Sequence, residues 1–384
     1  MYLTQGLHRA LQQRPDTEAT IYRGRVRTFA EVADRVARLA AALRGLGVAG
    51  GDRVAMLSLN SDRFSEYLLA VPWADAVLNP VNIRWSPAEV GYSLRDSDTR
   101  VLLVDDTFAA TVPALRAEVP ELEVVIHTGD GPAPDGTLSY EELIAGHEPV
   151  EDARRGGDAL AGLFYTGGTT GHPKGVMLSH ANLMISALGI LSTGYLFAPG
   201  TRCLHAAPMF HLADLAAWNA TTCVGGTHVI IPAFEPVAVL TAIAQHGATD
   251  ALLVPVMIQM LIDHPDITAH DLSSLRTVLY GASAIPQSVL ERAMKAFPSA
   301  SFTQAYGMTE LAPVATLLSP DDHRRTDLLR AAGRAAPHSE VRIVDAADPG
   351  DDTEVPRGTV GEIVARGGHV MLGYWNRPDE TAAA

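Results

Sequence analysis

Short apolar runs alternate with helix-forming segments along most of this 384-residue chain, and this alternation limits its fold more than any other feature. The strand-like runs include DRVAMLSL (52–59), RVLLVDD (100–106), GTHVIIPAF (226–234), DALLVPV (250–256) and LRTVLYGAS (275–283). Parallel strands need long crossover connections, which helices usually provide. The pattern therefore predicts an α/β fold of largely parallel sheets covered by helices, with too many strands for one ordinary sheet.

Capping boxes mark two of the expected helix starts. Thr28 is followed three residues later by Glu31, and apolar residues at helical spacing continue from there to Gly45. Ser86 is followed by Pro87 at the favoured first helical position and by Glu89. From about residue 313 the pattern changes to short β-like pieces with Gly and Pro turns, which predicts a small appended barrel or antiparallel sheet.

Composition limits the partners and the compartment. The formal net charge of -15 argues against nucleic acid or an anionic membrane as the main partner. Cys203 and Cys223 have no paired or zinc-type spacing, which fits a reducing cytoplasm. The longest uncharged run, 175–201, is interrupted by polar residues, Gly and Pro, so we expect a buried helix and turn there, no integral membrane segment, and a cytoplasmic protein.

The segment YTGGTTGHPKG (165–175) is the strongest candidate for an anion site. Glycines allow backbone N–H groups to approach a phosphate closely, and threonine hydroxyls and a lysine add donors. The loop is not a Walker motif, because His172 and Pro173 separate Gly171 from Lys174. A solvated surface turn is the alternative interpretation.

Four motifs in order resemble the adenylate-forming superfamily, which includes acyl-CoA synthetases, amino-acid adenylation domains and luciferases. They are YTGGTTGHPKGVMLSH from residue 165, PMFH (208–211), LYGASAIP (279–286) and QAYGMTE (304–310). GEIVARGGHVMLGYWN (361–376) is similar to the segment that follows them in that family. The resemblance covers essentially the whole chain.

The fold implied by this resemblance is two largely parallel β-sheets flanked by helices, in αβαβα layers, plus a small distorted β-barrel. Residues 1–384 would form one N-terminal adenylation domain. We expect its first sheet in 51–189, its second sheet in 1–50 with 190–312, and the barrel in 313–384. The family continues with a Thr-Gly-Asp segment and a mobile C-terminal domain carrying a catalytic lysine, neither of which occurs before Ala384. We therefore expect weak adenylation and no thioester formation from this chain alone.

The resemblance assigns a role to each motif. The glycine-rich loop would hold the β- and γ-phosphates of ATP through Thr166, Gly167, Gly168, Thr169, Thr170, Gly171 and Lys174. Gly281, Ala282 and Ser283 would line the adenine and carboxylate site. In the fourth motif, Gln304 and Gly307 would bind nucleotide, Tyr306 would stack on adenine, Thr309 would bind the α-phosphate, and Glu310 would bind Mg²⁺, a cation that prefers oxygen ligands. A helix N-terminal carboxylate is the structural alternative for Glu310.

His211 and Met308 indicate a branch of the family. Amino-acid adenylation domains carry an aspartate where this chain has His211, and proline where it has Met308, so the resemblance favours the acyl-CoA ligase branch. We expect His211 to shape the acyl site rather than to act as acid or base, although a core histidine is the plainer interpretation. Val, Met and Leu in DALLVPVMIQMLID (250–263) are candidates for an apolar acyl tunnel or for simple core.

The implied reaction converts a fatty or aryl carboxylic acid with ATP into acyl-AMP and then transfers the acyl group to coenzyme A. Lys174, Thr309, Glu310 and His211 are the candidate catalytic residues. Two alternatives stay open: an adenylating enzyme that loads a carrier protein, and a nucleotide- or acyl-binding fragment without catalysis. A homodimer is also left open. Ser283 is not a hydrolase nucleophile, because Ile285 stands where a nucleophile elbow needs glycine.

Overall fold

The computed structural model describes residues 1–167, 172–346 and 353–384, and their strands form three sheets. The first sheet has eight strands among these residues, in the spatial order β19 (Gly373–Tyr374), β9 (Lys174–Ser179), β8 (Leu160–Thr166), β4 (Val77–Pro80), β3 (Arg53–Leu57), β5 (Val101–Val104), β6 (Val124–His127) and β7 (Leu138–Ser139). All neighbouring pairs from β8 to β7 are parallel, whereas β9 and β19 add antiparallel strands at one edge.

The second sheet has nine strands among the described residues. Their spatial order is β16 (Arg334–Ala335), β15 (Val314–Leu318), β14 (Ser301–Gly307), β13 (Thr277–Gly281), β12 (Asp250–Leu253), β10 (Arg202–His205), β11 (Thr227–Ile230), β1 (Glu18–Tyr22) and β2 (Arg25–Thr28). From β14 to β1 the neighbours are parallel. The largely parallel α/β fold predicted from the alternating runs is confirmed.

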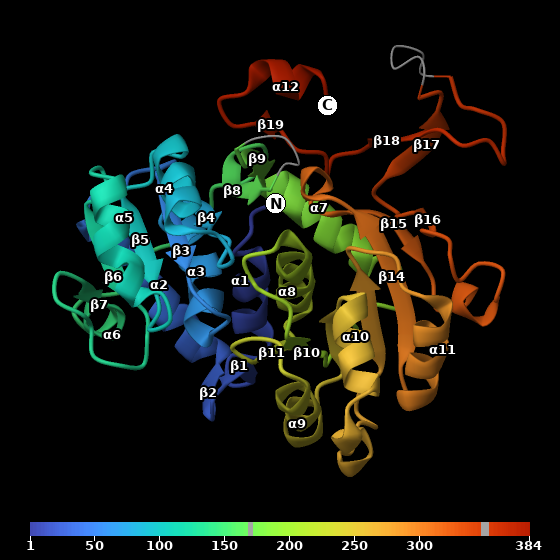
Figure 1. Cartoon of the computed structure of the whole chain (residues 1–384). Coiled ribbons are helices and arrows are strands. Elements are labelled where there is room, and N and C mark those ends of the chain that lie inside the picture. Colours follow the sequence, from blue (N-terminus) through green and yellow to red (C-terminus); the bar gives the residue numbers. More distant parts are fainter. Residues whose placement is uncertain (168–171, 347–352) are drawn as a thin grey trace.

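Helices cover both large sheets and separate them (Figure 1). They are α1 (Gln5–Gln13), α2 (Phe29–Gly45), α3 (Asp62–Trp73), α4 (Pro87–Asp96), α5 (Val112–Glu118), α6 (Tyr140–Ala145), α7 (His180–Leu191), α8 (Leu212–Val224), α9 (Pro236–His246), α10 (Pro255–Ile262), α11 (Gln287–Ala296) and α12 (Pro378–Ala382). Short 3₁₀ turns lie at η1 (Ala109–Thr111), η2 (Pro265–Ala269), η3 (Thr309–Leu311) and η4 (Asp322–Arg324).

Both predicted capping boxes are present. The Thr28 side chain accepts a hydrogen bond from the Glu31 backbone N–H, while the Glu31 carboxylate accepts one from the Thr28 N–H. Ser86 and Glu89 make the same reciprocal pair at the start of α4. Each box satisfies donors that the first helical turn leaves unpaired, so these local signals define where α2 and α4 begin.

The central helices join the two sheets through one hydrophobic core. Figure 1 shows α1, α7 and α8 in the middle of the molecule, between the two sheets. Leu7, Leu183 and Trp218 belong to the same buried cluster as Val54 of β3 and Ile230 of β11. Because residues from both sheets share this cluster, the two halves are held in a fixed relation.

The strands after residue 313 are distributed over all three sheets. β15 and β16 extend the second sheet, β19 pairs with β9 of the first, and β17 (Glu340–Val344) pairs with β18 (Glu362–Arg366) as a separate antiparallel ribbon. The predicted small barrel over 313–384 and the predicted subdomain boundaries stay predictions. The described part of the chain contains no helix long and apolar enough to cross a membrane.

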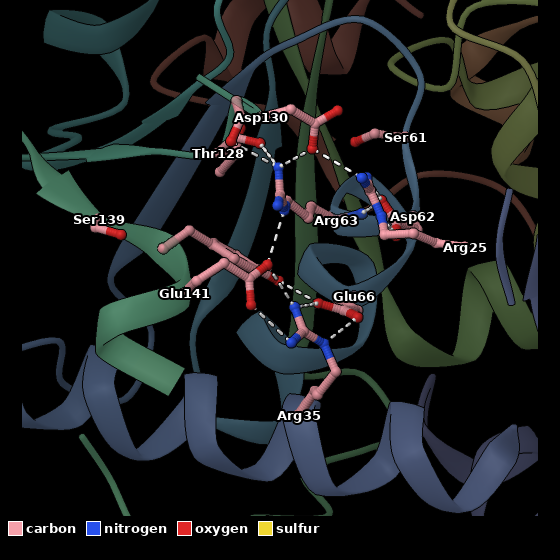
Figure 2. Close-up of polar contacts among 12 residues, drawn as sticks. Arg25, Arg35, Ser61, Asp62, Arg63, Glu66, Thr128, Asp130, Ser139 and Glu141 are labelled. Atoms are coloured by element: carbon pink, nitrogen blue, oxygen red, sulfur yellow. Dashed lines mark hydrogen bonds and ion pairs between the residues drawn. The ribbon is translucent and has the colours of Figure 1, made fainter. Parts of the chain in front are cut away.

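An ionic network fastens the β1–β2 hairpin, α2 and α6 to the start of α3. Figure 2 shows Arg63 between Asp130 and Glu141, with its Nη1 3.0 Å from Asp130 Oδ1 and its Nε 3.0 Å from Glu141 Oε1. Arg35 of α2 lies between Glu66 and Glu141, at 2.7 Å and 2.8 Å from their carboxylates. Charged groups from distant segments thus neutralise one another in a largely buried region.

Candidate active site

A cavity of about 490 Å³ opens at the carboxyl ends of the parallel strands of the second sheet. The segments that follow β10, β12, β13 and β14 all contribute to its wall. Carboxyl ends of parallel strands meet at one edge of a sheet, and ligands of open α/β sheets bind outside that edge. The position of this cavity is therefore the one that the sheet topology favours for a substrate.

Two glycines allow close backbone approach at this edge, Gly281 toward β14 and Gly307 toward the segment that enters β15. A Cβ atom on Gly281 would collide with the carbonyl oxygen of Ala305, and one on Gly307 would collide with the carbonyl oxygen of Pro313. Both glycines line the cavity, as does Ala282, which follows β13 with a φ of 67°. The motif at 279–286 thus meets the motif at 304–310 where the Gly281 backbone approaches Ala305 too closely for a side chain.

The cavity brings together most of the residues predicted from the second to fourth motifs. Its lining includes six of them: His211, Gly281, Ala282, Tyr306, Gly307 and Thr309. Ser283 is exposed beyond β13, and Gln304 lies in β14 within hydrogen-bond distance of the Tyr280 hydroxyl, at 3.4 Å. Neither Ser283 nor Gln304 is part of this lining.

Much of the remaining lining of the cavity is apolar. Its residues come from α7, α8, α10 and the strands beside them: Ile190, Ala207, Leu212, Ala213, Ala216, Leu252, Val254, Val256, Met257, Leu279 and Val314. The segment 250–263 contributes to both of its predicted environments, because Val254 and Met257 line the cavity whereas Ile258 and Leu261 are buried in the core. An apolar wall of this kind suits a hydrophobic acyl group.

His211 is the residue immediately before α8, at the cavity wall. Its ring centroid is 4.0 Å from that of Phe210. Desolvation lowers the pKa of His211 to about 4, and the positive charge of Arg84, which also lines the cavity, acts in the same direction. The imidazole is therefore neutral at neutral pH.

A second histidine near α8 belongs to the core. Asp214, one turn into α8, pairs with His205 at 2.8 Å, and His205 contacts His228 at 3.0 Å. All three side chains are buried. Asp214 thus faces the protein interior and takes no part in the cavity.

The glycine-rich loop lies between β8 and β9. Thr166 ends β8 and is paired in register with Lys174, the first residue of β9, so the loop begins and ends at one edge of the first sheet. Gly167 is exposed. Four predicted phosphate ligands lie outside the described residues: Gly168, Thr169, Thr170 and Gly171.

Lys174 and Glu310 lie beside the cavity and are connected through one tyrosine. Lys174 Nζ is 2.5 Å from Glu380 Oε2 and 4.9 Å from the ring centroid of Tyr374. The Tyr374 hydroxyl donates to Glu310 Oε1 at 2.8 Å. The sequence predicted Lys174 and Glu310 but assigned no role to Tyr374 or Glu380, although Tyr374 lies in the quoted segment 361–376.

The donor set fits the ligands that the sequence predicted. Mg²⁺ is usually held by one or two carboxylates together with substrate phosphates, and Glu310 offers a half-buried carboxylate directly after Thr309 of the cavity wall. Within the described residues no group of three His, Cys, Asp or Glu side chains could hold a metal ion. A magnesium ion here would therefore depend on phosphate oxygens for much of its coordination.

Comparison with known proteins shows the family of the chain. The model of the AMP-binding enzyme family matches residues 7–375. Feruloyl-CoA synthase of an Amycolatopsis species is 39% identical over 375 residues, which are 97% of this chain and 72% of the relative. The fatty acid–[acyl-carrier-protein] ligase ScoC of Streptomyces coeruleorubidus is 33% identical over 377 residues, 97% of this chain and 70% of the relative.

A solved structure extends the similarity to the fold. The anthranilate CoA ligase AuaEII in complex with anthranoyl-AMP matches with a TM-score of 0.93 and 26% identity, over 100% of this chain and 73% of that one. The fold of this chain is therefore that of a solved CoA ligase over its full length.

Proposed function

The chain belongs to the AMP-binding enzyme family, in the acyl-CoA synthetase branch of the adenylate-forming superfamily, and on this premise we propose that it activates an apolar carboxylic acid with ATP and transfers the acyl group to coenzyme A. A carboxylate oxygen of the acid attacks the α-phosphorus of ATP, and pyrophosphate leaves. The thiol sulfur of coenzyme A then attacks the carbonyl carbon of acyl-AMP, and AMP leaves. Both nucleophiles belong to substrates, so the protein acts by positioning and by charge stabilisation.

The observation that supports this proposal best is the composition of the cavity. Its lining contains Gly281, Tyr306 and Thr309, which are suited to a nucleotide, together with many apolar side chains. Lys174 and Glu310 lie beside the cavity, where they would bind phosphates and Mg²⁺. Mg²⁺ would neutralise charge on the phosphates of ATP. The four residues 168–171 stay predicted phosphate ligands.

The neutral state of His211 supports a role in shaping the acyl site. A histidine with a pKa of about 4 is a poor proton acceptor at neutral pH, and a substrate carboxylate with an ordinary pKa is already ionised there. His211 would therefore serve as part of the wall. Both aryl and fatty acids are proposed substrates, since the similar proteins include a feruloyl-CoA synthase and a fatty acid ligase.

Loading of a carrier protein is a second candidate function. The similarity to ScoC, whose name states an acyl-carrier-protein acceptor, favours this alternative. Both functions share the adenylation step and differ only in the thiol. A cytoplasmic location and a homodimer stay predictions.

The test measures binding and adenylation separately. Calorimetry with non-hydrolysable acyl-adenylate analogues of ferulic, anthranilic, medium-chain and long-chain acids should give saturable binding to the protein, whereas analogues of α-amino acids should bind far more weakly. Acid-dependent exchange of pyrophosphate into ATP should follow the same order of preference. Mass spectrometry of the thioester formed from coenzyme A or from a phosphopantetheinylated carrier protein identifies the acceptor. It is measured on a protein that also carries the family's mobile C-terminal domain, because this chain alone is expected to form no thioester.

Glu310→Gln tests the proposed magnesium ligand in the same assay. The amide keeps the shape of the side chain but loses the charge that a hard divalent cation needs, so exchange should lose most of its Mg²⁺-dependent rate. Absence of binding for every acyl-adenylate analogue would contradict the proposed function.

A further inference from the structure

Four side chains from four separate elements meet beside the glycine-rich loop. Lys174 begins β9, Glu310 lies in η3, Tyr374 ends β19, and Glu380 lies in α12. Tyr374 is the central member, because its ring lies under Lys174 Nζ while its hydroxyl donates to Glu310. One tyrosine therefore contacts both the residue expected to bind phosphates and the residue expected to bind magnesium.

The backbone around Tyr374 is tied to both of these neighbours. Tyr374 is opposite Val176 in the antiparallel pairing of β19 with β9, and the Trp375 N–H donates to the Gly175 carbonyl at 2.8 Å. The Met371 N–H donates to the carbonyl of Glu310 itself, also at 2.8 Å. The segment from 371 to 375 thus connects β9 with η3 through backbone hydrogen bonds, which fix the backbone position of Tyr374.

The hydrogen bond has the chemistry of a support for a metal ligand. A carboxylate has two oxygens, so Glu310 can accept from Tyr374 through Oε1 and still present Oε2 to a cation. Carboxylates that bind metals are commonly held in this way by a second residue. Burial, followed by the hydrogen bond to Glu310, raises the pKa of Tyr374, so the hydroxyl stays protonated and remains a donor.

We propose that Tyr374 is a positioning residue, which orients the Glu310 carboxylate for Mg²⁺ through its hydroxyl and holds Lys174 for the phosphates of ATP through its ring. The inference rests on the proposed function, because it takes Lys174 and Glu310 to be the phosphate and metal ligands. It gives a role to a residue to which the sequence assigned none, contributed by a strand that the sequence alone does not place beside Lys174 and Glu310.

Two substitutions separate the two contacts of Tyr374. Tyr374→Phe removes the hydroxyl and keeps the ring, so affinity for ATP measured with Mg²⁺ should fall about tenfold or more, whereas affinity measured in EDTA should stay within about twofold of the unaltered protein. Tyr374→Leu also removes the ring and should weaken ATP binding in EDTA. Isothermal titration calorimetry of ATP at several Mg²⁺ concentrations gives both quantities without any turnover.

Tyr140→Phe is the matched control. It also removes a tyrosine hydroxyl from a glutamate carboxylate, at 2.7 Å from Glu66, but in the ionic network of α3 and α6. Its affinity for ATP should equal that of the unaltered protein with and without Mg²⁺. Circular dichroism and thermal unfolding of all three variants establish that each is folded before titration.

The outcomes distinguish this inference from the proposed function. Equal losses for Tyr374→Phe with Mg²⁺ and in EDTA, or no loss in either, would overturn the positioning role. Failure of the unaltered protein to bind ATP at all would instead count against the proposed function. A specific loss of Mg²⁺-dependent affinity in Tyr374→Phe, shared with Glu310→Gln and absent from Tyr140→Phe, is the expected result.

Discussion

Two tyrosine–glutamate pairs in this molecule have nearly the same local chemistry and different surroundings. Tyr140 donates to Glu66 at 2.7 Å, and Tyr374 donates to Glu310 at 2.8 Å. Each tyrosine ring also lies within 6 Å of at least one cationic side chain. The difference lies in what else each glutamate contacts.

Both carboxylate oxygens of Glu66 accept hydrogen bonds from other side chains of the protein. Its side chain is fully buried, and Arg35 donates to both of its oxygens, at 2.7 Å and 3.1 Å. Arg35 in turn binds Glu141 (Figure 2). Asp62, one helical turn earlier, follows the same rule: burial opposes its ionisation, but the hydrogen bond from Arg25 and the charge of Arg27 outweigh burial and lower the pKa of Asp62. The charges of this region stabilise one another.

Glu310 retains capacity for a ligand. Within the described residues Tyr374 is its side-chain partner and no arginine or lysine pairs with it. The nearby Lys174 is partly exposed and is paired with a glutamate that is itself partly exposed. The Tyr140–Glu66 pair is therefore structural, because Arg35 also neutralises Glu66. The Tyr374–Glu310 pair has no arginine or lysine on its carboxylate among the described residues, so Glu310 can accept a metal ion.

The largest effect on stability is expected from removing the ion pair between Arg35 and Glu66. Arg35→Met should lower the free energy of unfolding by about 3 to 5 kcal/mol, because it leaves the buried Glu66 carboxylate without its main cation. Arg38→Met on the same helix removes a more exposed ion pair with Asp34 and should destabilise the protein far less. Urea unfolding measures both, and ATP affinity should be unchanged in both. Equal destabilisation by the two variants would contradict the contrast between the regions.

In the cluster of Lys174, Glu310, Tyr374 and Glu380, substitution should affect activity and leave stability nearly unchanged. Lys174→Ala should raise the adenylation barrier by about 2 to 4 kcal/mol, since it removes a donor to the transferring phosphates, while stability should change by less than about 0.5 kcal/mol. Lys295→Ala, at the chain's other lysine, is exposed on α11 and should change neither quantity. Pyrophosphate exchange and urea unfolding provide the two measurements. Unchanged ATP kinetics in Lys174→Ala would reject the assignment of the loop.

The sequence predicted those features whose signals are local. The capping boxes of α2 and α4 join residues three positions apart. The alternation of strands and helices implies parallel sheets, because a helix between two strands is long enough for the crossover that parallel strands need. The glycines at 281 and 307 were predicted from their motifs, and the structure adds the reason, namely close backbone approach at the strand ends. Motif residues therefore could be named before their geometry was known.

Features that depend on distant pairing were not predictable in this way. β19 has only two residues, and its pairing with β9 joins Tyr374 to Val176 far away in the chain. No local pattern specifies that partner, so neither Tyr374 nor Glu380 could be placed next to Lys174. The ionic network around Arg35 and Arg63 also depends on distant pairing, because its members come from β2, α2, α3 and α6. Charged residues in separate segments give no sign of which will meet.

The cavity and the core beside it should respond differently to added volume. Ala216 and Ala220 lie one turn apart on α8, but Ala216 lines the cavity whereas Ala220 is fully buried. Ala216→Leu should shift preference toward smaller acids by about 1 to 3 kcal/mol, with little loss of stability. Ala220→Leu should lower the free energy of unfolding by about 1 to 3 kcal/mol, because it overpacks the core. Unaltered acid preference in Ala216→Leu would show that this wall does not bind the acyl group.

The smallest effect concerns the ion pair that Lys174 makes in the absence of ATP. Glu380 presents a carboxylate to Lys174 Nζ at 2.5 Å, and this carboxylate must compete with phosphate oxygens for the same ammonium group. Exposed ion pairs contribute at most about 1 kcal/mol, so Glu380→Gln should tighten ATP binding by no more than about fivefold. The gain should shrink as salt is added, because screening weakens the competing pair as well.

Glu340→Gln is the control for this last comparison. Glu340 forms an exposed pair with Arg366 at 2.6 Å on the β17–β18 ribbon, so its substitution removes a similar charge without touching Lys174. Calorimetry of ATP at low and high salt should separate the two variants, with tighter binding only in Glu380→Gln. Weaker binding in that variant would mean that Glu380 helps to hold Lys174 in its binding position. The cluster around Lys174 would then be positioned by its own ion pairs, as the ionic network around Arg35 and Arg63 is. The two regions would differ only in how strongly these pairs position their side chains.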